Sequence, residues 1–122
     1  MVRVLYVDDE YINLNLFEIS FRKDFSIFKT LSAKEAIDIY KNNDIDVVIT
    51  DLKMPEMDGI EFIREIKRIK PEQNCILLTA YYEPKLIRDP DIKSIIYKYV
   101  VKPFKKTDLR NLIEEAKQRN AG

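Results

Sequence analysis

Strand-like and helical segments alternate along the chain, and this alternation is the strongest constraint on the fold. Short apolar or β-branched runs occur at five places: VRVLYV (2–7), FSIFKT (25–30), DVVIT (46–50), NCILLT (74–79) and YKYVV (97–101). Three of them are nearly continuous in Val, Ile and Leu, which is typical of parallel strands buried on both faces. We therefore expect an α/β fold with right-handed crossovers, a doubly wound five-stranded parallel sheet with helices on both faces.

The segments between the runs have apolar faces and recognisable starting signals. Apolar side chains recur at spacings of three and four within residues 10–22, 32–43 and 58–69, and again from about Thr107. Two of these segments open with a capping-box pattern, formed by Ser32 with Glu35 and by Asp58 with Glu61. Gly59 comes directly after the second cap, where we expect a side chain to crowd the backbone.

The fourth helical segment, YYEPKLIRDPDIKSII (81–96), is less regular because it contains Pro84 and Pro90. Proline is tolerated only in the first turn of a helix or outside it. We therefore expect a helix to start at Asp89–Pro90, which leaves a short or broken element ending at about Ile96.

Composition excludes several classes of function. The 122 residues suit a single domain with a continuous core, and the net charge of zero favours neither nucleic acid nor a membrane as partner. No apolar run is long enough to span a bilayer, and the N-terminus does not resemble a signal peptide. Cys75 is the single cysteine, cannot form an internal disulfide and is expected in the core, so we expect a cytoplasmic protein.

Two absences restrict the chemistry further. The chain has no histidine, which removes the commonest general base and transition-metal ligand. It has only two glycines, so neither a P-loop nor a dinucleotide-binding fingerprint is possible. Any chemistry must therefore use carboxylates, hydroxyls and lysines.

Such groups follow the predicted strands. The first run is followed by Asp8, Asp9 and Glu10, the third by Asp51, the fourth ends at Thr79, and the fifth is followed by Lys102, Pro103 and Phe104. Ligands of doubly wound sheets bind at the carboxyl ends of the strands, so we expect these side chains to converge. Clustered carboxylates repel one another unless a hard cation such as Mg²⁺ neutralises them. A lysine and a hydroxyl beside such an ion can bind a phosphoryl group, and a carboxylate can accept one as an acyl phosphate.

Each of these residues also has an ordinary structural explanation. Asp8 and Asp9 could cap the first helix, and Asp51 could belong to the turn that leads to Gly59. Thr79 could simply end a strand, and Lys102 could be a solvated charge. We favour the site because these independent explanations would all have to hold at the same edge of the sheet.

Four motifs in order, LYVDDE, VITDLKMPEMDGIEF, ILLTAY and YVVKPF, resemble the receiver domain of bacterial two-component response regulators, including the chemotaxis regulators. The resemblance extends over residues 1–122 and implies a single domain with the flavodoxin-like (βα)5 fold. It implies a switch rather than an enzyme acting on other molecules: Asp51 would accept a phosphoryl group from a histidine kinase or phosphotransfer protein and later lose it.

The resemblance also implies the roles of the remaining site residues. Mg²⁺ (or Mn²⁺) would be bound by Asp9, Asp51 and the backbone carbonyl of Lys53 directly, and by Asp8 mainly through water. Lys102 would bind the phosphate, and its peptide bond to Pro103 would be cis. Thr79 and Tyr99 would move together on phosphorylation and change the face formed by the fourth helical segment, the fifth strand and the last helix.

Partner contacts are a further implication of the resemblance. The phosphodonor would dock on the first helix and the loop after the fifth strand, through Ile12, Leu16, Pro103 and Phe104. Because the ending QRNAG contains no effector domain, output would pass to a downstream protein or to a domain beyond residue 122. We expect no direct binding of nucleic acid by this domain.

Three other functions share features with this sequence. A receiver-fold interaction module not controlled by phosphorylation is the main alternative, although Asp51, Thr79 and Lys102 are all present. A flavodoxin-type electron carrier would need a hydroxyl- and glycine-rich loop after the first strand. A phosphatase working through an aspartyl phosphate would need a second acid at position 53, where this chain has lysine. We hypothesise that Lys53 and Tyr81 together shield the acyl phosphate from water and so alter its lifetime.

Overall fold

A computed structural model describes residues 1–120; Ala121 and Gly122, the end of QRNAG, lie outside the described residues. The strands are β1 (Val2–Val7), β2 (Phe25–Thr30), β3 (Val47–Thr50), β4 (Cys75–Thr79) and β5 (Lys98–Val101). The helices are α1 (Tyr11–Phe21), α2 (Ala33–Asn42), α3 (Gly59–Ile69), α4 (Pro84–Arg88), α5 (Pro90–Ile95) and α6 (Lys106–Asn120). The five predicted strands are thus confirmed, and the last three each begin one residue later than the sequence pattern suggests.

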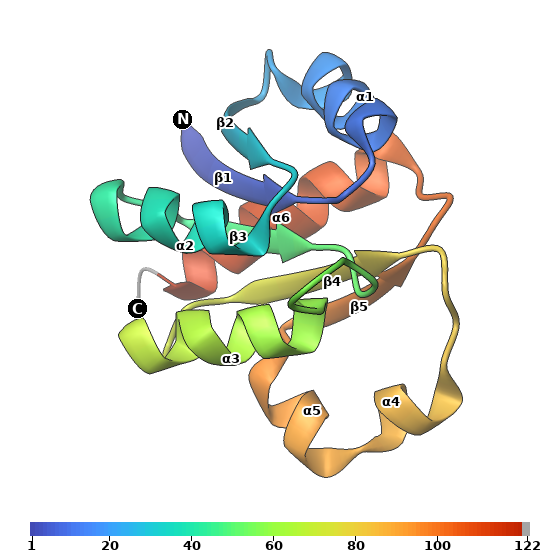
Figure 1. The fold of residues 1–122 in the computed structure, drawn as a ribbon. Helices are drawn as coiled ribbons and strands as arrows, with labels where there is room; N and C mark the ends of the chain where they lie inside the picture. Colours follow the sequence, from blue (N-terminus) through green and yellow to red (C-terminus); the bar gives the residue numbers. More distant parts are fainter. Residues whose placement is uncertain (121–122) are drawn as a thin grey trace.

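The sheet is entirely parallel, with the strand order β2-β1-β3-β4-β5 (Figure 1). The order reverses beside β1, so β1 and β3 are neighbours although they are far apart in the sequence. Ligands of doubly wound sheets bind at this switch point. The doubly wound fold expected from the alternation is therefore confirmed, and its switch point lies between the ends of β1 and β3.

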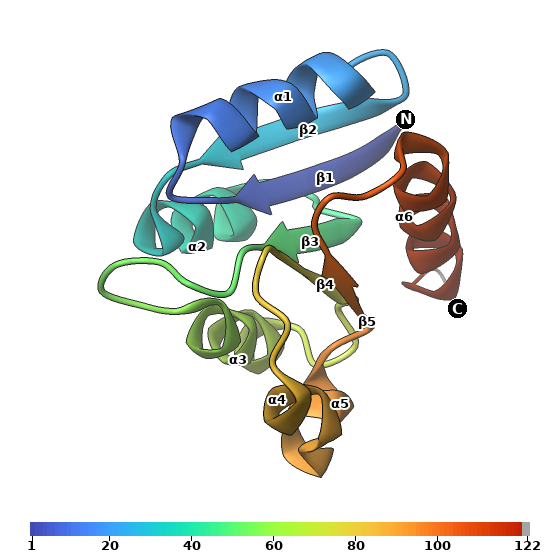
Figure 2. The ribbon, with the colours of Figure 1, turned by 90° about the vertical axis from the view of Figure 1, so that its right-hand side faces the viewer.

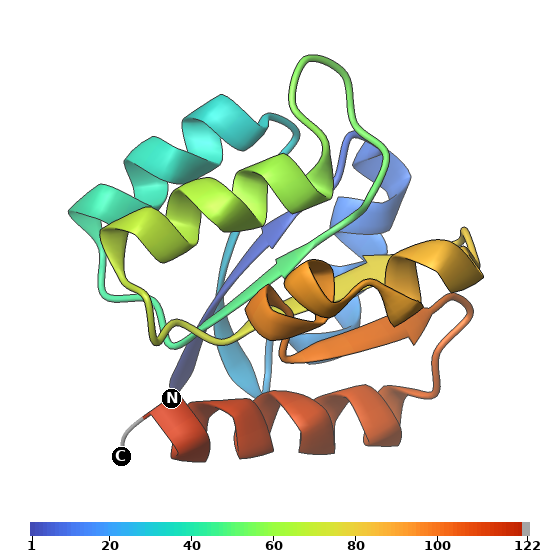
Figure 3. The same cartoon turned by 90° about the horizontal axis from the view of Figure 1, so that it is seen from below.

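Two hydrophobic clusters fill the spaces between the sheet and its helices. On one face, α1 and α6 pack against the sheet through Leu14, Phe17, Phe21, Leu109, Ile113 and Ala116 (Figure 2). On the other face α2 and α3 lie side by side and contribute Ala36, Tyr40, Ile60, Ile63 and Ile66 (Figure 3). Both faces of the central strands are therefore covered, which explains why their sequences are apolar without alternation.

The helix starts follow the capping signals with one exception. Both bonds of the capping box form between Asp58 and Glu61 at the start of α3. At α2, the Ser32 hydroxyl accepts a hydrogen bond from the backbone N–H of Glu35 at 3.3 Å. The second bond of a capping box, from the Ser32 N–H to the Glu35 carboxylate, is not formed in the described part of the chain. At Ser32 the predicted helix cap is therefore confirmed, but the predicted capping box is wrong because its second bond is missing. A hydroxyl that accepts an N–H bond already caps the helix by itself.

The irregular fourth segment forms two short helices with a proline in the first turn of each, α4 and α5. The Asp89 carboxylate accepts hydrogen bonds from the backbone N–H groups of Asp91 and Ile92, so the helix start predicted at Asp89–Pro90 is confirmed. Neither helix contains a buried residue. None of the helices formed by residues 1–120 is long and apolar enough to cross a membrane.

A polar network closes the edge of the sheet opposite the acidic residues. Gln73 is completely buried just before β4, and its side-chain carbonyl accepts a hydrogen bond from the Tyr40 hydroxyl at 2.7 Å. Its side-chain amide donates to the backbone carbonyl of Asp46 at 2.9 Å. The network joins α2 to the starts of β3 and β4 and satisfies both polar ends of the buried glutamine.

Candidate functional site

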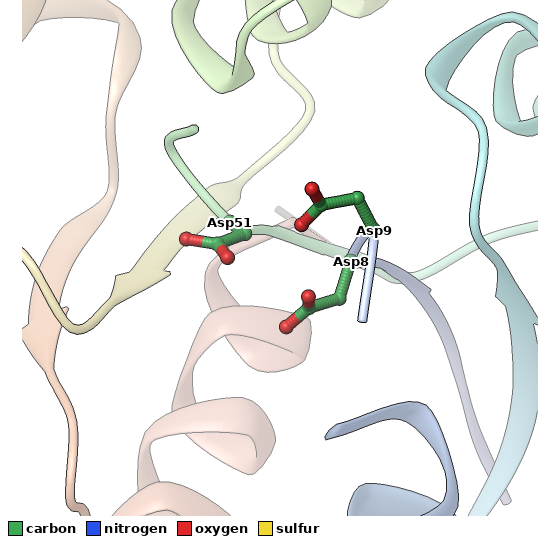
Figure 4. Close-up of side chains that lie close together, drawn as sticks. All are labelled: Asp8, Asp9 and Asp51. Carbon is green, nitrogen blue, oxygen red and sulfur yellow. The ribbon is translucent and has the colours of Figure 1, made fainter. Parts of the chain in front are cut away.

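Three aspartates meet at the carboxyl ends of β1 and β3. Carboxylate oxygens of Asp8, Asp9 and Asp51 lie within 4.8 Å of one another, and their side chains surround a common space (Figure 4). Asp8 and Asp51 are buried, whereas Asp9 is exposed. The expected convergence of these side chains is therefore present in the structure, with two of the acids buried and the third exposed to solvent.

Strand pairing places these acids together. β1 and β3 pair in register up to Val7 and Thr50, so the residues after them leave the sheet side by side. The backbone N–H of Asp51 also donates to the carbonyl of Val7 at 3.0 Å, which extends the ladder by one bond. The backbone N–H of Leu52 donates to the Asp51 carboxylate at 2.7 Å and restricts its orientation.

The buried Asp8 carboxylate has three hydrogen-bond donors around it. Its Oδ2 accepts from the Tyr6 hydroxyl at 2.7 Å and from Lys102 Nζ at 2.9 Å. Its Oδ1 accepts from the backbone N–H of Glu10 at 3.0 Å. Burying a carboxylate is costly unless it is paired and hydrogen-bonded, and this set of donors meets that requirement.

Lys102 connects the acids to β4 and β5. Its backbone N–H donates to the carbonyl of Thr79 at 2.8 Å, and its peptide bond to Pro103 is cis, as the resemblance implied. Its ammonium nitrogen lies 2.9 Å from Asp8 and 4.0 Å from Asp51. One cation thus faces three carboxylates, which leaves the cluster with an excess of negative charge.

This excess affects the protonation of Asp51. Burial raises the pKa of the Asp51 carboxyl above its ordinary value, and the charge of Asp8 raises it further. The ammonium of Lys102 and hydrogen bonds from Leu52 and Thr79 act in the opposite direction. The pKa of Tyr6 is raised by burial and by the neighbouring Asp8 charge, so its hydroxyl stays a hydrogen-bond donor at physiological pH.

Thr79 and Tyr99 both hold the backbone of Tyr81. Thr79 is completely buried, and its hydroxyl oxygen accepts a hydrogen bond from the Tyr81 N–H at 3.2 Å. The Tyr99 hydroxyl donates to the Tyr81 carbonyl. The loop after β4 is therefore tied by one residue at the site and by one on β5.

The side chains of Lys53 and Tyr81 meet above this loop. Lys53 Nζ lies 4.6 Å from the centroid of the Tyr81 ring, a cation–π geometry, and 3.6 Å from a carboxylate oxygen of Glu83. Lys53 and Tyr81 are both exposed. These contacts connect the loop after β3, which begins with Asp51, to the loop that follows Thr79 at the end of β4.

The residues expected to dock a partner differ in exposure. Ile12 and Leu16 on α1 are 69% and 57% exposed, and Pro103 is also exposed. Phe104 is instead partly buried, and its ring lies 6.2 Å from that of Phe21 in a stacked arrangement. Phe104 therefore packs the loop against α1 as well as bordering the surface.

The sequence-based expectations do not include Tyr6 and Glu83 near the site, or Ile19 on the exposed surface of α1. Tyr6 lies two residues before Asp8 on the same side of β1, and a polar group in an apolar strand at that spacing was the available signal. Ile19 continues the exposed stripe of Ile12 and Leu16 by helical spacing. Glu83 gives no comparable signal, since its approach to Lys53 depends on the path of an irregular loop.

The fold and the site together define a class of protein: a doubly wound α/β domain with an acidic cluster, a lysine and a threonine at its topological switch point. Residues 4–114 match the family model of the response regulator receiver domain. The chain belongs to this family.

Individual relatives agree with the assignment. The chain is 30% identical over 114 residues to Sporulation initiation phosphotransferase F of Bacillus subtilis, covering 93% of this chain and 91% of that protein. It is similar to the crystal structure of a receiver domain protein from Clostridium thermocellum, with a TM-score of 0.90, 31% identity, and 99% and 98% of the two chains covered. It is also similar to response regulator TrrA of Thermotoga maritima in complex with Mg²⁺ and BeF, with a TM-score of 0.84, 30% identity, and 95% and 99% covered.

Proposed function

We propose that residues 1–122 form a single receiver domain that accepts a phosphoryl group on Asp51, from a histidine kinase or a histidine phosphotransfer protein. The observation that carries the proposal is the position of Asp51: its carboxylate lies beside two further aspartates and 4.0 Å from the ammonium of Lys102. Phosphoryl transfer depends mainly on positioning and charge neutralisation, so a site without histidine is sufficient.

The donor set suits Mg²⁺ or Mn²⁺. Clustered oxygen ligands favour hard divalent cations, and such ions neutralise the excess negative charge of the three acids. We propose that Asp9, Asp51 and the backbone carbonyl of Lys53 bind the ion directly and that Asp8 binds it mainly through water. The ion would supply charge neutralisation for the phosphoryl oxygens.

In the proposed reaction, a carboxylate oxygen of Asp51 attacks the phosphorus of a phosphohistidine in line. The P–N bond breaks as the new P–O bond forms, and the imidazole leaves with the electron pair. Lys102 neutralises a phosphoryl oxygen, and we propose that its ammonium turns from Asp8 toward the new group. Hydrolysis of the acyl phosphate later returns Asp51 to its original state.

Thr79 and Tyr99 are proposed to transmit the change. When the Thr79 hydroxyl turns to the phosphoryl group, it releases the Tyr81 N–H, and Tyr99, whose hydroxyl donates to the Tyr81 carbonyl, turns inward with it. The output surface would be formed by α4, α5, β5 and α6. An open pocket of about 360 Å³, lined by residues of α4, α5 and β5, lies at this surface, and we propose that the two short helices shift around it. The phosphoryl group acts by favouring one of two existing arrangements.

Docking of the phosphodonor is proposed at α1 and the loop after β5. Ile12, Leu16 and Pro103 offer exposed apolar area beside the acidic rim, with Phe104 at its border. A partner that presents a phosphohistidine on a helix could bury this area while the histidine reaches Asp51.

The test is phosphorylation by acetyl phosphate with Mg²⁺, followed by mass spectrometry of the intact protein. We expect a mass gain of about 80 Da, the value for one phosphoryl group, that requires Mg²⁺ and is lost in Asp51→Asn. Asp58→Asn is the matched control, because it makes the same substitution at a helix cap where asparagine also caps. A folded protein without any Asp51-dependent gain would contradict the proposal and favour the interaction module.

A further inference from the structure

Tyr6 brings a hydroxyl group into the core directly beneath the acidic site. The residue is 1% exposed in the middle of β1, and its hydroxyl donates to Asp8 Oδ2 at 2.7 Å. A phenylalanine would fill the same space without the polar group. The hydroxyl therefore serves a purpose other than packing, and it donates to the buried carboxylate of the site.

The Tyr6 side chain is enclosed in the core, whereas that of Lys102 is partly exposed. The ring of Tyr6 lies 4.5 Å from that of Phe17, which in turn lies 4.9 Å from that of Phe21. Lys102 instead follows the end of β5, and 18% of its long side chain is exposed. Of the two side chains that donate to Asp8 Oδ2, only the lysine can leave without disturbing the core.

In the proposed reaction, Lys102 turns away from Asp8. In the unphosphorylated protein, Asp8 Oδ2 accepts hydrogen bonds from two side chains, Tyr6 and Lys102. Once the ammonium of Lys102 turns to a phosphoryl oxygen, the Tyr6 hydroxyl is the one of these two donors that remains. A buried carboxylate that loses a partner is strongly destabilised, and this cost would oppose the transfer of Lys102.

We infer that Tyr6 is a positioning residue that keeps Asp8 hydrogen-bonded and in place while Lys102 moves from Asp8 to the phosphoryl group. This inference rests on the proposed phosphorylation of Asp51. It assigns to the tyrosine a function that neither packing nor metal binding requires, because the hydroxyl lies inside the core and acts on Asp8 from below.

The test separates binding of Mg²⁺ alone from binding of a phosphoryl analogue. Calorimetric titration measures the affinity of wild type and Tyr6→Phe for Mg²⁺, and then for fluoroberyllate at saturating Mg²⁺. We expect the variant to lose about tenfold in fluoroberyllate affinity, since a hydrogen bond to a charged group is worth at least this factor. The affinity for Mg²⁺ alone should change by less than about threefold, because Lys102 still neutralises Asp8 in that state.

Tyr40→Phe is the matched control. Its hydroxyl is also buried and also donates at 2.7 Å to a side chain, Gln73, but at the opposite edge of the sheet. We expect this variant to lose stability in urea without any loss of fluoroberyllate affinity. A second measurement uses the wild type: the slowly exchanging hydroxyl proton of Tyr6 should remain visible by NMR when fluoroberyllate is bound.

Three results would overturn the inference. One is unchanged fluoroberyllate affinity in Tyr6→Phe; another is an equal loss for Mg²⁺ and for fluoroberyllate, which would indicate a merely structural effect. The third is disappearance of the Tyr6 hydroxyl proton from the wild-type complex. Failure of the wild type to bind fluoroberyllate would instead contradict the proposed function, on which the inference depends, and is recognised without any variant.

Discussion

Gly59, the first residue of α3, lies directly against the backbone of Asp51. A Cβ atom on residue 59 would lie 2.1 Å from the Asp51 carbonyl oxygen, far inside van der Waals contact. The Gly59 N–H also donates to the carbonyl of Leu52 at 2.7 Å. The helix start and the candidate phosphorylation site therefore touch backbone to backbone, and the expectation that a side chain would crowd this turn is confirmed.

Gly59→Ala is therefore expected to destabilise the protein by about 2 kcal/mol or more, because the new methyl group can be accommodated only if the backbone moves. The displaced backbone carries Asp51, so phosphorylation by acetyl phosphate should also slow. Urea denaturation and intact mass measure the two effects. Helix propensity alone predicts the opposite sign, a gain of about 0.5–1 kcal/mol. Ala33→Gly, the reverse change at the first residue of α2, serves as the reference for propensity.

Asp51→Asn should raise the free energy of unfolding without Mg²⁺, on the order of 1 kcal/mol, by removing a carboxylate repelled by Asp8. Because the pKa of Asp51 is raised by burial, the folded state binds more protons than the unfolded state between the two pKa values. Wild-type stability therefore falls as pH rises through that window. The advantage of the variant should be greatest at neutral pH, should begin to shrink as the pH falls below the raised pKa, and should disappear below the ordinary pKa that the carboxyl has in the unfolded chain.

Denaturation of both proteins across this pH range tests the sign. Added Mg²⁺ should stabilise the wild type and have much less effect on Asp51→Asn, because a ligand stabilises only the state that binds it. A gap in unfolding free energy that widened toward acid pH would contradict the assigned direction of the pKa.

Lys53 and Tyr81 should slow hydrolysis of the acyl phosphate by limiting the approach of water. Their cation–π contact at 4.6 Å covers the gap between the loops after β3 and β4. We expect Lys53→Asn and Tyr81→Ala each to shorten the phosphate lifetime by about threefold, a contact energy of under 1 kcal/mol. Lys34→Asn is the control, since Lys34 is an exposed lysine whose ion pair is also 3.6 Å long but joins α2 to Glu56 and not to Tyr81 or Glu83. Equal acyl-phosphate lifetimes in the wild type and the three variants would contradict the proposed shielding by Lys53 and Tyr81.

The exposed stripe of α1 should matter only to a protein phosphodonor. Ile12→Ser with Leu16→Ser should leave urea stability and labelling by acetyl phosphate unchanged, because both side chains are exposed. Transfer from the phosphorylated cognate histidine kinase should fall by about tenfold or more, as expected for loss of central interface contacts. Ile69→Ser, at an exposed isoleucine on α3, should leave transfer unchanged. Equal losses from both donors would place the effect inside the site and not at the docking surface.

Much of this structure could be predicted because its determinants are local. Runs of apolar residues specify buried parallel strands, and Asp89–Pro90 marks a helix start whatever surrounds it. The convergence of Asp8, Asp9 and Asp51 could also be predicted, because parallel strands end at a common edge. Only the alternation of strands and helices was needed for that step.

Other features depend on side-chain positions that no local pattern encodes. The return bond from Glu35 to the Ser32 N–H is replaced by another one, since that N–H donates to the hydroxyl oxygen of Thr30 at 3.2 Å. The partial burial of Phe104 depends on Phe21, which is far away in the sequence. The shared use of Asp8 Oδ2 by Tyr6 and Lys102 requires β1 and β5 to be placed in three dimensions.

The buried Gln73 network has a consequence for protein engineering. It ties α2 to the starts of β3 and β4, whereas every group proposed for phosphoryl transfer follows the ends of the strands. The residues of this stabilising network are therefore separate from the residues proposed for signalling. Libraries that vary the surroundings of Tyr40 and Gln73 can tune thermal tolerance while leaving the timing of the signal untouched.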